Sequence, residues 1–76
     1  MDAIKTRDEL EFAVFCIENV AIELGVSAVK VYDAWTRKSD LLNRYVVGCY
    51  EPLHTQGKDY IVEDILLVMR KEGIEI

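Results

Sequence analysis

The sequence has little of what metal sites and disulfides are built from. It contains one histidine and two cysteines in 76 residues, and Cys16 and Cys49 lack the close spacing of structural zinc ligands. One histidine leaves too few ligands for a closed site, so we expect no metal and no cofactor. Isolated thiols among apolar residues are typical of buried, reduced cysteines in a cytoplasmic protein.

Long apolar runs and an excess of basic residues are also missing. The most apolar stretch, residues 12–24, is interrupted by Glu18, Asn19 and Glu23 and is too short and polar to span a bilayer. The N-terminus lacks an apolar signal segment, so we expect a cytoplasmic protein with no membrane partner. Nine Lys and Arg against 14 Asp and Glu give a net charge of −5. This balance argues against nucleic acid as a partner, because phosphates would be repelled.

What the sequence does contain is a series of helix signals. Hydrophobic residues make up 51% and charged residues 30%, the balance of a folded chain. Residues 6–9 have the Thr-x-x-Glu form of a capping box, in which Thr6 and Glu9 bond each other's backbone N–H groups. Gly25 is a natural left-handed stop. These signals predict a first helix that ends at Leu24.

Similar signals divide the remaining chain into three more helices. Ser27 can cap a second helix over residues 28–38, and Ser39 or Asp40 can cap a third. The last helix is expected over residues 61–72, before Gly73. Strand signals are too short to build a sheet. We therefore predict a single domain, residues 1–76, with an all-α fold: a compact bundle of about four helices.

The only proline interrupts the third predicted helix. Inside a helix, Pro52 would remove one hydrogen bond and clash with the carbonyl of Gly48. The helix can kink between these two residues, or it can end near Glu51 and restart with Pro52 in a first turn. We favour the kink, because the apolar spacing continues through Leu53, and we expect Gly57 to end the segment.

The first helix is apolar on two sides. At 100° per residue its core face is Leu10, Ala13, Val14, Ile17, Val20, Ala21 and Leu24. A second stripe holds Phe12, Phe15, Asn19 and Ile22. Either this helix is central to the bundle or the second stripe meets another protein. Leu67 lies off the apolar face of the last helix and is a further candidate interface residue.

The other helices have simpler predicted faces. The second buries Ala28, Val31, Tyr32 and Trp35, with Trp35 as a core anchor. The third buries Leu42, Tyr45, Val46, Cys49, Tyr50 and Leu53. The last buries Ile61, Val62, Ile65, Leu66, Val68 and Met69.

His54 is the side chain best suited to acid–base chemistry or metal binding. Cys49, five residues away, would face another side of a helix, and nothing in the spacing supplies more ligands. The structural alternative is a helix terminus, with His54 against Tyr50 and with Thr55 and Gln56 bonding free carbonyls. A third interpretation is a polar recognition loop made of His54, Thr55, Gln56, Asp59 and Tyr60.

A helix-turn-helix DNA reader is an alternative for the second and third helices. Such a reader needs polar side chains toward base edges, and the third helix offers only Asn43 and Arg44 early on. Lys30, Arg37 and Lys38 are placed to contact phosphates. With a charge of −5 this interpretation ranks below protein binding.

Four segments resemble a known family. They are residues 10–18 (LEFAVFCIE), 38–40 (KSD), 53–62 (LHTQGKDYIV) and 64–65 (DI). Together they are similar to small bacterial proteins of the domain-of-unknown-function family numbered 3791, over about residues 9–73. Pro52 departs from that pattern, where an ordinary helix former is expected. The resemblance implies a stand-alone bacterial cytoplasmic protein without established enzyme activity, found beside genes for toxin-like proteins resembling ADP-ribosyltransferases.

These observations favour a protein-interaction module that binds itself or a partner protein, as an antitoxin or an accessory to a toxin-like neighbour. Its surplus apolar side chains motivate this interpretation, and we do not expect an enzyme. The alternatives are a DNA-binding regulator of helix-turn-helix type and a small enzyme or metal protein that uses His54.

Overall fold

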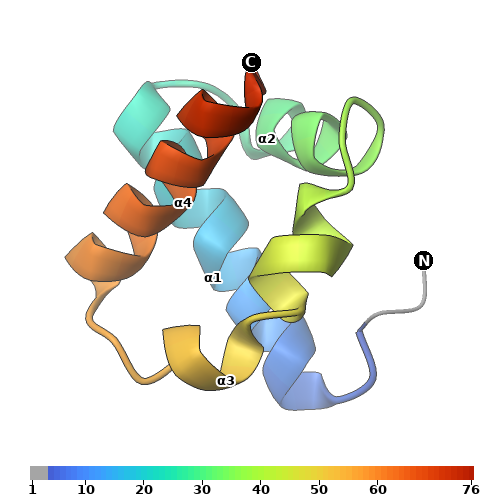
Figure 1. Cartoon of the computed structure of the whole chain (residues 1–76), viewed down its shortest axis with the longest axis vertical. Coiled ribbons are helices and arrows are strands. Elements are labelled where there is room, and N and C mark those ends of the chain that lie inside the picture. Colours follow the sequence, from blue (N-terminus) through green and yellow to red (C-terminus); the bar gives the residue numbers. More distant parts are fainter. Residues whose placement is uncertain (1–3) are drawn as a thin grey trace.

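The computed structural model describes residues 4–76, which contain helices and no strand (Figure 1). The elements in order are α1 (Arg7–Leu24), α2 (Ala28–Thr36), a π-helical segment η1 (Leu42–Val47), α3 (Tyr50–Leu53) and α4 (Lys58–Glu72). The predicted all-α bundle is confirmed. There are five helical elements in this range because the expected third helix is divided into η1 and α3.

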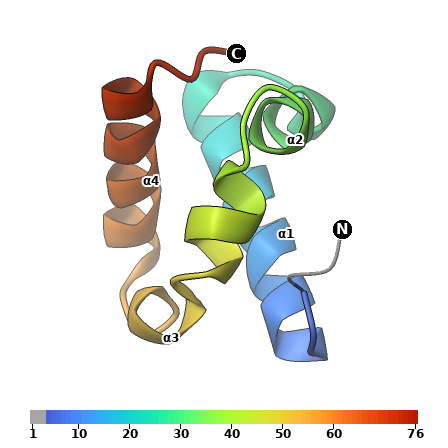
Figure 2. The same ribbon diagram turned by 45° about the vertical axis from the view of Figure 1, so that its right-hand side comes forward.

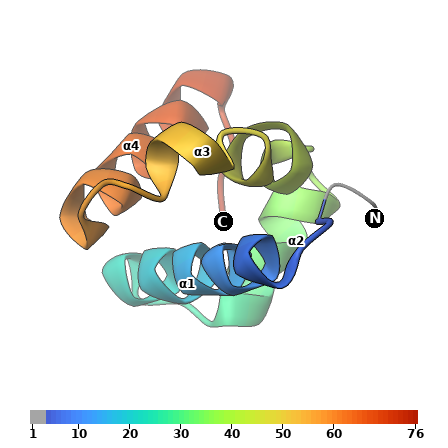
Figure 3. The same ribbon diagram turned by 90° about the horizontal axis from the view of Figure 1, so that it is seen from below.

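The helices form two layers around one core. From below, α1 lies in one layer and η1, α3 and α4 lie in the other (Figure 3). Seen from the side, α4 stands upright with α3 below its first turn, and η1 lies between α4 and α1 (Figure 2). Helix α1 contacts α2, η1 and α4, so it is the central helix of the bundle. No single helix among residues 4–76 is long and apolar enough to cross a membrane; α1 and α2 reach that length only together, with a bend of 116° between them.

Local hydrogen bonds set both ends of α1. The Thr6 hydroxyl accepts from the backbone N–H of Glu9 at 3.1 Å, as the capping box predicts. The Glu9 carboxylate accepts from the N–H of Lys5 at 2.7 Å instead of from that of Thr6. At the other end Gly25 has a φ of 68°, and the N–H of Val26 donates to the carbonyl of Ala21 at 3.0 Å. The predicted boundaries of α1 are confirmed.

The ends of α2 and α4 differ slightly from the prediction. Ser27 caps α2, but the helix ends at Thr36 instead of residue 38, because the N–H groups of Arg37 and Lys38 both turn to the Asp33 carbonyl. Helix α4 begins three residues early, at Lys58, since the extended backbone of Gly57 serves as its N-cap. Its end at Gly73, with a φ of 71°, is as predicted.

The third predicted helix breaks instead of kinking. The N–H of Gly48 donates to the carbonyl of Asn43, five residues back, at 3.1 Å, and α3 restarts at Tyr50. Pro52 therefore sits in the first turn of α3, where a missing N–H costs least. The preferred prediction of one kinked helix is wrong. The helix breaks because Pro52 has no N–H to donate to the carbonyl of Gly48, so the chain ends one helix and starts another.

The core is wholly apolar within residues 4–76 and is built around Trp35. Trp35 is fully buried, which confirms it as a core anchor, and its Nε1–H finds no acceptor among the described residues. Cys16 is also fully buried, and desolvation raises the pKa of its thiol to about 12. The Cys16 thiol therefore stays protonated. Cys49 was also expected to be buried, but its side chain is half-buried.

The core face of α1 is rotated from the predicted one. Its buried residues are Phe12, Ala13, Cys16, Val20 and Ala21. Leu10, Val14 and Leu24, predicted to be core, are 50%, 44% and 42% exposed. The physical reason is that apolar residues surround most of α1, so its own pattern does not select a face. The packing of η1 and α4 selects it.

The other predicted faces are partly right. On α2, Val31 and Trp35 are buried as expected, but Ala28 and Tyr32 are exposed and Ala34 is buried in their place. In η1, bonds over five residues rotate the side chains that follow, so Val47 is buried and Tyr45 is only half-buried. Of the six residues predicted to be buried on α4, Leu66 and Val68 are only half-buried. The other four are buried: Ile61, Val62, Ile65 and Met69.

Two polar side-chain pairs connect η1 to α4. The Arg44 guanidinium donates to Glu72, and the Tyr45 hydroxyl donates to the carboxylate of Asp64. The Arg44 pair is largely exposed and contributes little to stability. Burial raises the pKa of Tyr45 above the usual 10.0, and the bond to Asp64 raises it further.

Trp35→Ala should lower the free energy of unfolding by about 3–5 kcal/mol, as large-to-small core changes do. Trp35→Phe should cost much less, because it keeps an aromatic ring and removes the N–H that lacks a partner. Urea unfolding followed by circular dichroism measures both. Equal costs for the two variants would contradict a packing role for the ring.

Gly48→Ala should destabilise the fold by about 1–3 kcal/mol, the usual cost of overpacking. An added Cβ would lie 2.3 Å from the backbone carbonyl oxygen of Arg44. Gly57→Ser is the matched control, because a Cβ added at Gly57 would have nothing within 4 Å and the serine hydroxyl can cap α4. Thermal melting compares them, and an unchanged melting temperature for Gly48→Ala would show that the break tolerates a side chain.

Tyr45→Phe should remove about 0.5–1.5 kcal/mol of stability at neutral pH, since it deletes the bond to Asp64. The raised folded pKa makes this contribution fully present below about pH 10 and lost as the pH rises through the folded value. The gap between wild type and variant should therefore close in alkaline solution. Urea unfolding from pH 7 upward measures it, and a constant gap would refute the assignment.

Candidate functional site

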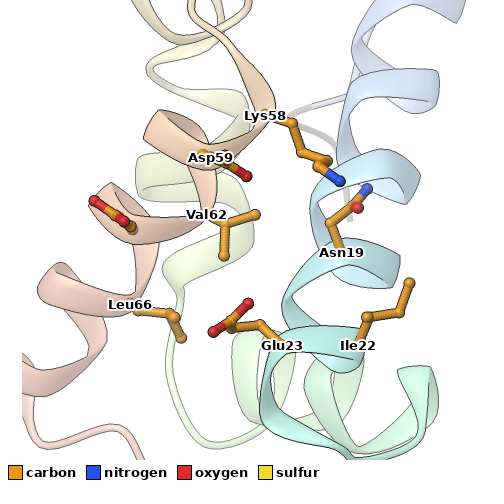
Figure 4. A pocket seen from close by; sticks show the side chains of 8 residues that line it. Asn19, Ile22, Glu23, Lys58, Asp59, Val62 and Leu66 are labelled. Atoms are coloured by element: carbon orange, nitrogen blue, oxygen red, sulfur yellow. The ribbon is translucent and has the colours of Figure 1, made fainter.

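A cleft between α1 and α4 holds part of the predicted interface (Figure 4). Its volume is about 130 Å³, and Asn19 and Ile22 line it from α1. Ile22 is 77% exposed, and the Asn19 amide donates to the carbonyl of Phe15 at 2.8 Å. Figure 4 shows the amine of Lys58 directed toward Asn19, with the Glu23 carboxylate lower in the view between the two helices. The cleft is small and lined by charges of both signs.

The other candidate interface residues lie elsewhere. Phe12 is only 8% exposed and belongs to the core, so its surface is unavailable to a partner while the domain is folded. Phe15 is half-buried beside it. Leu67 is 42% exposed and lines a separate hollow on α4 with Tyr60. The predicted stripe is therefore divided between core and solvent.

A second surface, the α1–α2 apolar patch, was missed by the sequence interpretation. It is lined by Val14, Ile17, Ala28, Val29 and Tyr32, and Glu18 is its one charged residue. Val29 is 67% exposed, and Val14 and Tyr32 are each 44% exposed. One feature of the sequence could have predicted this patch: Val29 is apolar but lies outside the predicted buried side of α2.

A third surface is the aromatic groove, which lies among α1, α3 and the start of α4. The Phe12 and Tyr50 rings meet edge to face with centroids 5.4 Å apart, and Phe15 lies 6.4 Å from Phe12. Tyr50 and His54 stack at 4.3 Å and 4°, which confirms the predicted contact across one turn. Gln56 and Ile61 complete the lining with Asp8 and Glu11, and the groove volume is about 320 Å³.

Carboxylates give this groove a negative field. Desolvation raises the pKa of Tyr50, and Asp8, Glu51, Glu9 and Glu11 raise it further through their charges. The Glu51 carboxylate lies 3.7 Å from Nε2 of His54.

The predicted recognition loop is spread over several surfaces. His54 and Gln56 line the aromatic groove, Asp59 lines the α1–α4 cleft, and Tyr60 lines the hollow beside Leu67. The Thr55 hydroxyl donates to the carbonyl of Pro52 at 3.1 Å, as expected of a helix terminus. Residues adjacent in the chain thus line different surfaces of the domain.

The two alternative interpretations concern a metal site and a surface for nucleic acid. Within residues 4–76 no group of three or more His, Cys, Asp or Glu side chains is placed to hold a metal ion. Of the cations suited to phosphate contacts, Arg37 lies 3.7 Å from the carboxylate of Asp33 and Arg44 donates to Glu72.

A family model described as "Protein of unknown function (DUF3791)" matches residues 11–72. This confirms the resemblance noted from the sequence. No curated protein and no solved structure matches the chain.

Proposed function

This chain belongs to the DUF3791 family, and we propose that it is a small, non-enzymatic protein-interaction module. In this proposal the α1–α2 apolar patch buries against a second copy of the chain or a partner protein. The family resemblance suggests a toxin-like protein encoded nearby as that partner, and thus an antitoxin or accessory role.

The observation that carries the proposal is the composition of the patch. Four aliphatic side chains and Tyr32 surround the hollow, and only Glu18 is charged. Such a surface offers few groups to orient a polar ligand or to catalyse a reaction, but it gains free energy whenever another apolar surface removes it from water. The α1–α4 cleft and the aromatic groove both carry more charges, so they are less suited to apolar association.

The patch is not the result of an open core. The accessible surface of the chain is 4857 Å², close to the roughly 4700 Å² expected of a compact monomer of this mass. A specific interface commonly covers about 800 Å² on each partner, or about a sixth of that surface. The patch and neighbouring Leu10 supply the apolar centre of such an area.

Val29→Glu should abolish self-association or partner binding while the domain stays folded. Val29 occupies the second position of α2, where a carboxylate interacts favourably with the helix dipole and replaces a β-branched side chain. Sedimentation velocity measures self-association, and co-purification with the protein encoded by the adjacent gene measures partner binding.

Ile22→Glu is the matched control, because it adds the same charge to α1 at an exposed site outside the patch. It should leave association unchanged. If Ile22→Glu dissociates the complex and Val29→Glu does not, the α1–α4 cleft is the interface. If the wild-type protein neither self-associates nor retains its neighbour, the proposed module function fails.

A further inference from the structure

The aromatic groove combines two properties that the other surfaces lack. Its lining includes aromatic rings from separate elements, Phe15 of α1 and Tyr50 of α3, and the buried ring of Phe12 packs against both. Its lining also includes the carboxylates of Asp8 and Glu11. Aromatic rings beside carboxylates favour a cation with an extended apolar stem, because ring faces and carboxylates both attract positive charge.

The geometry of the rings is held by the fold. Phe12 is buried against the core, so it fixes the position of Tyr50 through their edge-to-face contact. The imidazole of His54 in turn stacks on the Tyr50 ring, and the two rings are nearly parallel. The planar platform is therefore present before any ligand arrives, which lowers the entropy cost of binding.

The charges around the groove are one-sided. Asp8 and Glu11 line the groove, and their negative charges, with those of Glu9 and Glu51, add to desolvation in raising the pKa of the Tyr50 hydroxyl. The nearest opposing charge on the same helix is Arg7, which lies 3.9 Å from Glu11 in a largely exposed pair. Exposed pairs of this kind are weak and exchange readily, so a cation from outside can replace Arg7 at Glu11.

We propose that the aromatic groove receives an arginine side chain from a basic segment of the protein partner. This inference deepens the proposed interaction function and rests on it, since the occupant belongs to a partner protein. The guanidinium stacks on the aromatic platform and donates to Asp8 or Glu11, while the aliphatic stem contacts Phe15 and Ile61. Arginine fits better than lysine because its planar, weakly hydrated cation both stacks and forms paired hydrogen bonds.

The test uses a capped pentapeptide, Gly-Ser-Arg-Ser-Gly, and the same peptide with citrulline, which has the same shape but no charge. Both are titrated into isotopically labelled protein while NMR records the ring signals of Phe15, Tyr50 and His54. The arginine peptide should shift these signals saturably, and citrulline should weaken binding about tenfold or more. Added salt should weaken the arginine complex alone.

Asp8→Asn with Glu11→Gln should reduce the affinity for the arginine peptide about tenfold. The matched control is Asp59→Asn with Glu63→Gln, which removes two charges from the first half of α4 at the α1–α4 cleft. This control should bind as wild type does. If the first pair unfolds the domain, Tyr50→Leu replaces it, because it keeps an apolar side chain and removes the ring face.

Three outcomes overturn the inference. They are no saturable shift with the arginine peptide, equal binding of citrulline, and equal losses in the groove and control variants, which would show only a bulk charge effect. The titration is repeated on Val29→Glu protein. If Val29→Glu protein binds the arginine peptide but the wild-type protein associates with no protein, the proposed module function is wrong and the arginine site in the groove stands. Protein association without arginine binding would do the reverse.

Discussion

The other helices are arranged around one buried stripe of α1, formed by Phe12, Cys16 and Val20. Helices α2 and α4 and the segment η1 all pack against α1. A chain of 76 residues has little other material for a core. Among residues 4–76, no further element covers the opposite side of α1. The exposed Leu10 and Val14 follow from that shortage, and with α2 they define the surface that we propose as the interface.

The break between η1 and α3 has a comparable consequence for the aromatic groove. Pro52 and Gly48 together end one helix and start the next, which redirects the chain before Tyr50. The four residues of α3 would be marginal as an isolated helix. They are held by Leu53 in the core and by the contact between Tyr50 and Phe12. A local defect in helix geometry thus places Tyr50 and His54 beside α1.

The two proposed binding surfaces differ in the interaction that would stabilise a complex. The α1–α2 apolar patch depends on removing aliphatic surface from water, an effect that is non-directional and that salt does not screen. The aromatic groove depends on ring faces and carboxylates, which select charge and planarity and weaken with ionic strength. A partner that uses both surfaces would gain affinity chiefly from the first and specificity chiefly from the second.

The all-α class, the caps of α1 and the stop at Gly73 could be predicted from the sequence, because each depends on hydrogen bonds among residues close in the chain. The stacking of His54 on Tyr50, one turn apart, was predictable for the same reason. The buried side of α1 could not be predicted in this way, since apolar residues lie on most of its circumference and the packing of α4 and η1 selects one side. The tertiary structure also shows that Phe12 belongs to the core while Ile22 faces solvent, and that Asp8 and Glu11 stand beside Tyr50. Those neighbours are some forty residues apart in the chain, and no local periodicity encodes a contact between separate helices.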